Sequence, residues 1–205
     1  MSDDTTPRSA RRPAPGARAA AGTTRAPGAE RRGDAGAQAI VIGPARDDDA
    51  PAISALNNLY AADGLTLPRT PAFVAARIDG YRVARDAEGR VVGCVAVDEY
   101  APSLAELVSL AVAPEAQGKG LGRRLIAEAE RVARQRGYAE LIAVSLADTL
   151  FLSAGFAQSS IAHYPEKQAR YAAISRSELS IGKKFLFVMP LRGPARRERR
   201  RGRRR

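Results

Sequence analysis

The chain reads Glu106-Leu-Val-Ser-Leu-Ala-Val-Ala-Pro-Glu-Ala-Gln-Gly-Lys-Gly-Leu-Gly122 near its centre, and this stretch decides the fold. Its first part is largely apolar and favours a β-strand, which Pro114 stops. Three alternating glycines, Gly118, Gly120 and Gly122, then let the backbone turn tightly and approach a ligand closely. The stretch therefore predicts a strand that ends in a ligand-binding loop.

A helix is predicted directly after the loop. Leu121, Leu125, Ala129 and Val132 recur at helical spacing, and Gly137 ends the pattern. The start of a helix presents free backbone N–H groups and the positive end of the helix dipole, so a pyrophosphate bound there gains several charge-assisted hydrogen bonds. The loop therefore predicts an anionic ligand of the nucleotide type.

The neighbours of the glycines separate the families that share such loops. No Gly-Lys-Ser/Thr follows, which argues against a P-loop NTPase, and the alternating glycines do not give the Gly-x-Gly-x-x-Gly of a Rossmann site. The order Gln117-x-x-Gly120-x-Gly122 after a strand instead resembles the acetyl-coenzyme A loop of the GNAT acetyltransferases. The resemblance covers roughly residues 40–191.

Four separated motifs resemble one group within that superfamily, the short amino-acid N-acetyltransferases that serve as N-acetylglutamate synthases in arginine biosynthesis. They are Gly64-Leu65-Thr66-Leu67-Pro68-Arg69, Val91-Val92-Gly93-Cys94, residues 105–112 and Pro165-Glu166-Lys167. The resemblance implies an α/β fold of the GNAT type, in which a mixed central sheet flanked by helices is splayed at the acetyl-CoA site. Coenzyme A would enter between the strand ending at Val112 and the strand at residues 139–145.

The periodicity of residues 39–191 indicates the same α/β order. A helix is expected to start at residues 47–51 and to place Ile53, Leu56 and Leu59 on one face, and a second is expected to run from Thr70 to Gly80. A short helix capped by Asp148 follows later. Strands are expected at residues 39–45, 81–85, 91–97, 106–112, 139–145, 156–161 and 184–188.

The strong positive charge belongs to the two ends of the chain. The net charge is +11 at pH 7, yet residues 39–191 hold equal numbers of basic and acidic residues. Residues 1–38 are rich in Ala, Pro and Arg and are expected to be a disordered tail, with an organellar transit peptide as the alternative interpretation. No apolar run approaches the length of a membrane span. We therefore expect a cytoplasmic enzyme with one folded domain at residues 39–191.

The other tail, residues 192–205, is a block of arginines that could bind polyanions by counterion release. It holds no aromatic residue on which a base could stack, so such contact from Arg192 to Arg205 would be non-specific. A polyanion-binding protein with secondary or no catalysis is therefore one alternative function.

Acetyl transfer to an amine requires that the amine first lose a proton. Glu106 is our candidate general base, because it lies in an apolar strand and eleven residues before Gln117, the offset of the general-base glutamate in histone-type GNAT enzymes. The alternatives are an exposed residue at the start of the strand or a structural partner of an arginine.

The leaving thiolate also needs a proton. Many GNAT enzymes supply it from a tyrosine four residues before the glycine of a Gly-Phe pair, and here that place is occupied by Phe151. A phenyl ring cannot donate a proton, so water, Ser145 or an unidentified group must do so, and we expect Phe151 to pack in the core.

The resemblance also assigns the residues that bind the co-substrate, acetyl-CoA. The strand residues Leu110, Ala111 and Val112 would pair with the pantetheine arm, and a backbone N–H there would meet the oxyanion. The pyrophosphate would be held by Gln117, Gly118, Lys119, Gly120, Leu121, Gly122 and Arg123.

An acidic amino-acid acceptor needs a cation in the pocket, because it carries a carboxylate near its amine. We expect Arg69 to bind this carboxylate, with Lys167 as the second candidate; solvated loop residues are the alternative. The chain departs from the short N-acetylglutamate synthases after Lys167, where they often carry cysteines and residues 171–184 have none.

Neither Cys94, the single cysteine, nor His163, the single histidine, lies in a cluster with ligand spacing, so no metal site is expected. The sequence predicts direct transfer of acetyl from acetyl-CoA to the α-amino group of a free amino acid, glutamate or glutamine. A protein or peptide N-acetyltransferase is the other alternative.

Overall fold

The computed structural model describes residues 40–173 and 185–192. The expected tail at residues 1–38 lies outside the described residues, as do the expected tail at residues 192–205 except Arg192 and most of residues 171–184. The described part forms a mixed sheet of seven strands in the order β1-β2-β3-β4-β5-β7-β6. Their bounds are β1 Val41–Pro44, β2 Tyr81–Arg85, β3 Val91–Ala101, β4 Leu104–Val112, β5 Glu140–Ser145, β6 Ala157–Ser159 and β7 Phe185–Pro190. The predicted α/β class is confirmed, and the elements that were predicted occur in the expected order.

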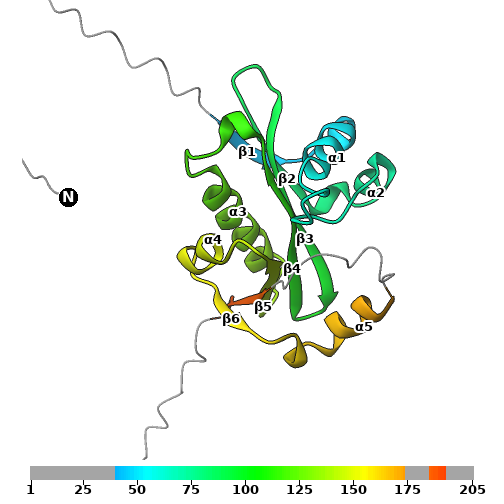
Figure 1. Cartoon of the computed structure of the whole chain (residues 1–205), viewed down its shortest axis with the longest axis vertical. Coiled ribbons are helices and arrows are strands. Elements are labelled where there is room, and N and C mark those ends of the chain that lie inside the picture. The colour runs from blue at the N-terminus through cyan, green and yellow to red at the C-terminus, as the bar shows by residue number, and fades with distance from the viewer. Residues whose placement is uncertain (1–39, 174–184, 193–205) are drawn as a thin grey trace, which may run out of the picture. The chain divides into compact units, whose positions relative to one another are not determined.

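Helices cover both faces of this sheet (Figure 1). They are α1 Ala50–Asn58, α2 Pro71–Ala75, α3 Leu121–Gln135, α4 Asp148–Ser153 and α5 Pro165–Ala173, with 3-10 turns η1 Asp47–Asp49, η2 Ile78–Gly80, η3 Pro114–Ala116 and η4 Ile161–His163. Helix α1 packs on β3 and β4 from one side, and α3 packs on β2, β3 and β4 from the other. The apolar stripe of α3 predicted from its spacing is buried there, including Leu125 and Ala129.

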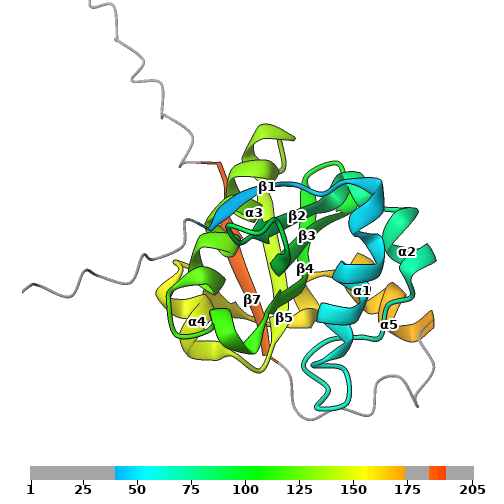
Figure 2. The ribbon, with the colours of Figure 1, turned by 90° about the horizontal axis from the view of Figure 1, so that it is seen from above.

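The sheet opens between β4 and β5, its one parallel pair in the described part of the chain. The two strands lie side by side in Figure 2 and are paired only where Leu104–Leu107 faces Glu140–Ala143. Beyond Leu107, β4 runs on to Val112 without a partner on this side, while β5 continues in register with β7 as far as Ser145. The splay that the resemblance implied is therefore present, and it exposes the backbone edge of β4.

Local details differ from the sequence predictions. The helix expected from Thr70 to Gly80 is interrupted, because α2 ends at Ala75 and the chain resumes as the 3-10 turn Ile78–Gly80. Leu59 is exposed rather than on the buried face, since α1 ends one residue before it. The N-cap of α4 is Ala147, and the Asp148 carboxylate accepts from the backbone N–H of Thr149 at 2.6 Å.

The sequence analysis also missed elements that shape the site. The strand expected at residues 91–97 continues to Ala101, so β3 and β4 form a long hairpin. Helix α5 was not predicted from Pro165-Glu166-Lys167, although Pro at a first helical position is a common helix start. Within the described residues, no helix is both long enough and apolar enough to cross a membrane.

Candidate active site

A cavity of about 1130 Å³ lies where β4 and β5 part. Its wall contains nearly every residue that the sequence predicted for the site: Arg69, Glu106, Leu110, Ala111, Val112, Gln117, Gly118, Gly120, Leu121, Gly122, Arg123 and Lys167. Lys119 is the exception, because it does not line the cavity and its Nζ donates to the backbone oxygen of Glu115 at 3.2 Å. The fold therefore joins the glycine loop and Glu106 in one continuous space.

The glycine loop enters α3 through two left-handed residues. Gly118 and Gly120 have φ of 73° and 74°, a conformation that side chains other than glycine rarely adopt. Gly120 is the N-cap of α3, so the first backbone N–H groups of the helix face the cavity without partners inside the helix. These N–H groups and the helix dipole suit an anion at this end of the cavity.

Tyr60 ties this loop to the end of β4. Its hydroxyl donates a short hydrogen bond to the backbone oxygen of Val112 and accepts one from Gln117 Nε2 at 2.7 Å. Gln117 Nε2 also lies 3.2 Å from the same Val112 oxygen. The sequence analysis did not identify Tyr60, because it lies far from the loop in sequence, just after α1. Two side chains thus join the glycine loop to the end of β4.

A β-bulge interrupts β4 beside the cavity. Cys94 faces Ala111 and Ala96 faces Val108, so Ser109 and Leu110 together oppose a single residue of β3. Ser109 takes the left-handed φ of 52°, and its hydroxyl lies 3.3 Å from that of Tyr81. The bulge lies in the part of β4 that β5 does not pair, where a ligand amide or an oxyanion could meet a backbone N–H.

Glu106 and Lys167 form a buried ion pair. Nζ of Lys167 lies 2.6 Å from both carboxylate oxygens of Glu106 and 2.9 Å from the hydroxyl of Tyr100. Burial raises the pKa of Tyr100, and the neighbouring charge of Glu106 raises it further. Glu106 is therefore not exposed, and among the described residues its ion-pair partner is Lys167 rather than an arginine.

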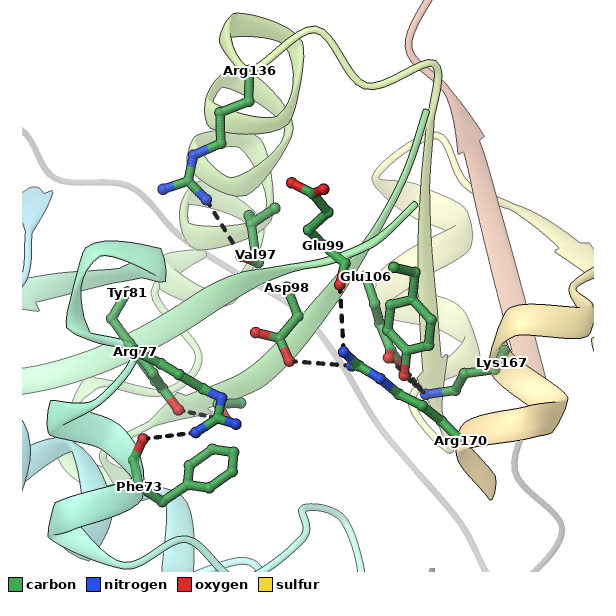
Figure 3. Close-up of polar contacts among 12 residues, drawn as sticks. Phe73, Arg77, Tyr81, Val97, Asp98, Glu99, Glu106, Arg136, Lys167 and Arg170 are labelled. Atoms are coloured by element: carbon green, nitrogen blue, oxygen red, sulfur yellow. Dashed lines mark hydrogen bonds and ion pairs between the residues drawn. The ribbon is translucent and has the colours of Figure 1, made fainter. Parts of the chain in front are cut away.

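A second pair lies beside the first and was missed by the sequence analysis. Asp98 of β3 is the cross-strand partner of Glu106, and its carboxylate lies 3.7 Å from the guanidinium of Arg170 on α5 (Figure 3). Arg170 also lies over the ring of Tyr100, with its Cζ 4.0 Å from the ring centroid. The sequence signals for this second pair were the alternating pattern of β3 and the spacing of Lys167 and Arg170 by one helical turn. They were not used because α5 had not been predicted.

Arg69 is held in place by polar side chains of α1. Its backbone oxygen accepts from Ser54 Oγ at 2.7 Å and from Asn58 Nδ2 at 2.8 Å, and its N–H donates to Asn58 Oδ1 at 2.9 Å. Asn57 Nδ2 fixes the same loop through the oxygen of Leu67 at 2.8 Å. Polar residues at helical spacing in α1, Ser54, Asn57 and Asn58, were the sequence signal for this loop anchor.

A second arginine of the cavity wall shares an aromatic partner with Arg69. The Cζ atoms of Arg69 and Arg77 lie 4.3 and 3.9 Å from the centroid of the Phe73 ring. Neither guanidinium forms an ion pair with a carboxylate among the described residues, and both line the cavity. The wall formed by α2 and the preceding loop is therefore cationic.

Phe151 packs in the core as expected. It is buried, stacks on Phe187 with centroids 5.4 Å apart and meets Phe156 edge-on at 5.2 Å. Ser145 lines the cavity, and its Oγ accepts from the N–H of Ala147 at 3.0 Å. The hydroxyl hydrogen of Ser145 is not used in that bond.

The remaining candidates of the sequence analysis lie apart from this chemistry. Cys94 is fully buried under the bulge, and burial raises the pKa of its thiol to about 12. His163 is exposed in η4, where its Nδ1 lies 3.4 Å from Ser159 Oγ. Among the described residues, no cluster of three or more His, Cys, Asp or Glu residues is suited to hold a metal ion.

Comparisons with known proteins agree on the family. Residues 54–157 match the acetyltransferase (GNAT) family. An uncharacterised N-acetyltransferase of Chlorobaculum tepidum is 37% identical over 123 residues, which are 60% of this chain and 79% of the relative. An amino-acid acetyltransferase of Ralstonia nicotianae is 30% identical over 140 residues, which are 67% of this chain and 31% of the relative.

A solved structure shows the same fold. The N-acetylglutamate synthase of Neisseria gonorrhoeae, complexed with coenzyme A and N-acetyl-glutamate, superposes with a TM-score of 0.67 and 28% identity over 75% of this chain and 35% of that one. This chain thus spans only about a third of the length of that synthase and of the Ralstonia relative. The glycine loop, the splayed sheet and the matched region lead to one conclusion: this chain belongs to the acetyltransferase (GNAT) family.

Proposed function

We propose that this protein transfers acetyl from acetyl-CoA directly to the α-amino group of a free amino acid, with glutamate or glutamine as the acceptor. The observation that carries the proposal is one cavity whose wall joins the glycine loop at the start of α3 to two arginines on the α2 side, Arg69 and Arg77, and to two carboxylates, Asp98 and Glu106. Acetyl-CoA as co-substrate follows from the family, whose solved members include complexes with coenzyme A and acetyl-CoA.

The splayed edge of β4 is suited to the donor. We infer that the pyrophosphate lies on the glycine loop and that the pantetheine arm runs along Leu110 to Val112, adding to the sheet as a strand would. The Val112 oxygen is already occupied by Tyr60 and Gln117, so the arm would pair with the other free groups of this edge. The thioester would then lie beside the bulge at Ser109 and Leu110.

The cationic wall is suited to the acceptor. Arg69 and Arg77 lie in the cavity without carboxylate partners among the described residues, so a substrate carboxylate would gain charge-assisted hydrogen bonds there. The loop of Arg69 is fixed to α1, which lowers the entropic cost of placing this guanidinium. Lys167 remains the second candidate for this role, although its ammonium faces Glu106 in this structure.

The chemistry needs one base and one route for a second proton. Glu106 would take a proton from the acceptor ammonium, and the neutral nitrogen would then attack the thioester carbon. A backbone N–H near Leu110 would stabilise the oxyanion while the C–S bond breaks. The nitrogen gives up its second proton as the amide forms, and the thiolate takes one up through water or Ser145, whose hydroxyl lines the cavity. No covalent acetyl-enzyme is required.

The relatives support an amino-acid acceptor. The Ralstonia relative is named an amino-acid acetyltransferase, and the Neisseria gonorrhoeae synthase is complexed with N-acetyl-glutamate. On this basis we propose that the protein acts in arginine biosynthesis in the cytoplasm.

The test is the release of coenzyme A thiol by the purified full-length protein. Acetyl-CoA is presented with glutamate, glutamine, ornithine, other free amino acids and a short peptide, and the acetylated product is identified by mass. Saturable turnover of glutamate or glutamine supports the proposal. Turnover of the peptide alone would favour the protein or peptide acetyltransferase, and no turnover of any free amino acid would overturn the proposed acceptor class.

A further inference from the structure

Two carboxylates lie side by side on the cavity wall. Asp98 and Glu106 are directly opposed across the antiparallel β3–β4 hairpin, so their side chains share one face of the sheet, and both line the cavity. Like charges in this position repel each other. Helix α5 offsets the repulsion with Lys167 and Arg170, which lie one turn apart and face this pair (Figure 3).

Glu106 and Asp98 differ in how closely a basic side chain contacts their carboxylate oxygens and in how exposed they are. Both oxygens of Glu106 lie 2.6 Å from Lys167 Nζ, and the Glu106 side chain is 5% exposed. Asp98 has one ion-pair partner among the described residues, Arg170, at 3.7 Å, which is beyond hydrogen-bond distance. The Asp98 side chain is 27% exposed and that of Arg170 is 52% exposed. A cation in the cavity would therefore meet Asp98 as the more accessible carboxylate.

Asp98 lies between the two halves of the cavity wall. Figure 3 shows its carboxylate between the α2 side, with Arg77 and Phe73, and the α5 side, with Lys167 and Arg170. The α2 side carries cations without carboxylate partners in the described residues. A free amino acid is a zwitterion, so its carboxylate fits the α2 side and its ammonium fits the carboxylate nearest to it, Asp98.

We propose that Asp98 binds the ammonium of the acceptor and positions the nitrogen beside Glu106. This inference rests on the proposed function, because it assumes a free amino acid in the cavity. Asp98 makes and breaks no covalent bond. It accepts hydrogen bonds from the ammonium, one proton of which passes to Glu106 before the nitrogen attacks the thioester. Asp98 then keeps the remaining N–H groups oriented so that the nitrogen lone pair points at the thioester carbon.

A purely structural role of Asp98 would be to hold α5 in place through its ion pair with Arg170. Substituting each partner of this ion pair in turn separates that structural role from ammonium binding. Asp98→Asn removes the carboxylate, whereas Arg170→Gln removes its partner and leaves the carboxylate in place. Ammonium binding predicts that Asp98→Asn raises the acceptor KM about tenfold or more, because a hydrogen bond to a charged group is lost. Arg170→Gln is expected to keep the acceptor KM within about twofold or to lower it.

A second readout identifies the group that Asp98 contacts. The acceptor that wild type uses best is compared with its deaminated analogue, which is glutarate if that acceptor is glutamate, as a competitive inhibitor. Asp98→Asn should weaken the acceptor and leave inhibition by the analogue unchanged, since the analogue has no ammonium. The KM for acetyl-CoA and the thermal midpoint of each variant show whether the fold and the donor site are intact.

The outcomes are distinct. Equal losses in Asp98→Asn and Arg170→Gln, or equal weakening of acceptor and analogue, would overturn the role of Asp98 and leave the proposed function standing. An unchanged acceptor KM in Asp98→Asn would do the same. If wild type turns over no free amino acid, the proposed function itself fails, and the role of Asp98 fails with it.

Discussion

The buried pair of Glu106 and Lys167 predicts a large and specific loss of stability when one partner is removed. Lys167→Met keeps a long unbranched side chain but removes the ammonium that contacts both carboxylate oxygens of Glu106 at 2.6 Å. Lys167 and Glu106 have side chains that are 8% and 5% exposed, so water cannot replace the lost contacts. The variant leaves a desolvated carboxylate next to Asp98, which carries the same charge.

The size of this effect follows from burial. Breaking a buried ion pair by removing one partner costs roughly 3–5 kcal/mol of the free energy of unfolding. For a chain of this length that corresponds to a fall of roughly 6–20 °C in the thermal midpoint. Urea unfolding followed by far-UV circular dichroism gives the free energy, and a thermal scan gives the midpoint.

The matched control is an ion pair of equal length on the surface. Arg131 lies 2.6 Å from Glu128 on α3, but its side chain is 51% exposed, so Arg131→Met should move the midpoint little. The double variant Glu106→Gln with Lys167→Met removes both charges and should recover part of the loss. If the thermal midpoint of Lys167→Met were as high as that of Arg131→Met, the reasoning that burial makes the Glu106–Lys167 pair stabilising would be refuted.

Three further predictions concern Glu106, Gly120 and Cys94. Glu106→Gln should lower kcat by roughly 10²–10⁴ in steady-state kinetics with the KM for acetyl-CoA kept, because a general base is lost; a wild-type kcat would remove Glu106 from the mechanism. Gly120→Ala should cost roughly 1–2 kcal/mol through its left-handed backbone and should raise the KM for acetyl-CoA, whereas Gly43→Ala, with open space and an ordinary φ, should change neither value. Burial raises the pKa of Cys94 to about 12, so its protonated thiol should resist a thiol reagent at pH 8 until denaturant is added. Because the pKa of the Cys94 thiol is higher in the folded protein than in the unfolded chain, urea titrations should also show the free energy of unfolding falling as pH rises above about 8.5. Rapid reaction of Cys94 with the thiol reagent in the native protein would contradict its burial.

The parts of the fold that the sequence predicted are those set by local chemistry. The strand to Val112, the stop at Pro114, the glycine loop and α3 all follow from period, proline and glycine within one short stretch. Gly118 and Gly120 could be recognised because a left-handed φ restricts the residue type directly. The family could therefore be predicted from this stretch, and the glycine loop that it predicted lines the cavity.

The parts that it missed depend on contacts between distant segments. Asp98 lies one residue beyond the strand predicted at residues 91–97, and its pairing with Glu106 depends on the register of the hairpin. Tyr60 meets Gln117 across 57 residues of sequence, and Lys167 meets Glu106 across 61. Lone polar residues of this kind carry no period, so nothing local assigns them a partner.

By itself the sequence determined that this chain ends a strand in a glycine loop at the start of a helix, because backbone conformation and helical period depend on neighbouring residues. Only the tertiary structure decided which charges meet in the cavity. There the hairpin register places Asp98 beside Glu106, and α5 supplies Lys167 to one and Arg170 to the other. Burial then distinguishes the two carboxylates, because Glu106 is 5% exposed and held by Lys167, whereas Asp98 is 27% exposed and lies 3.7 Å from Arg170.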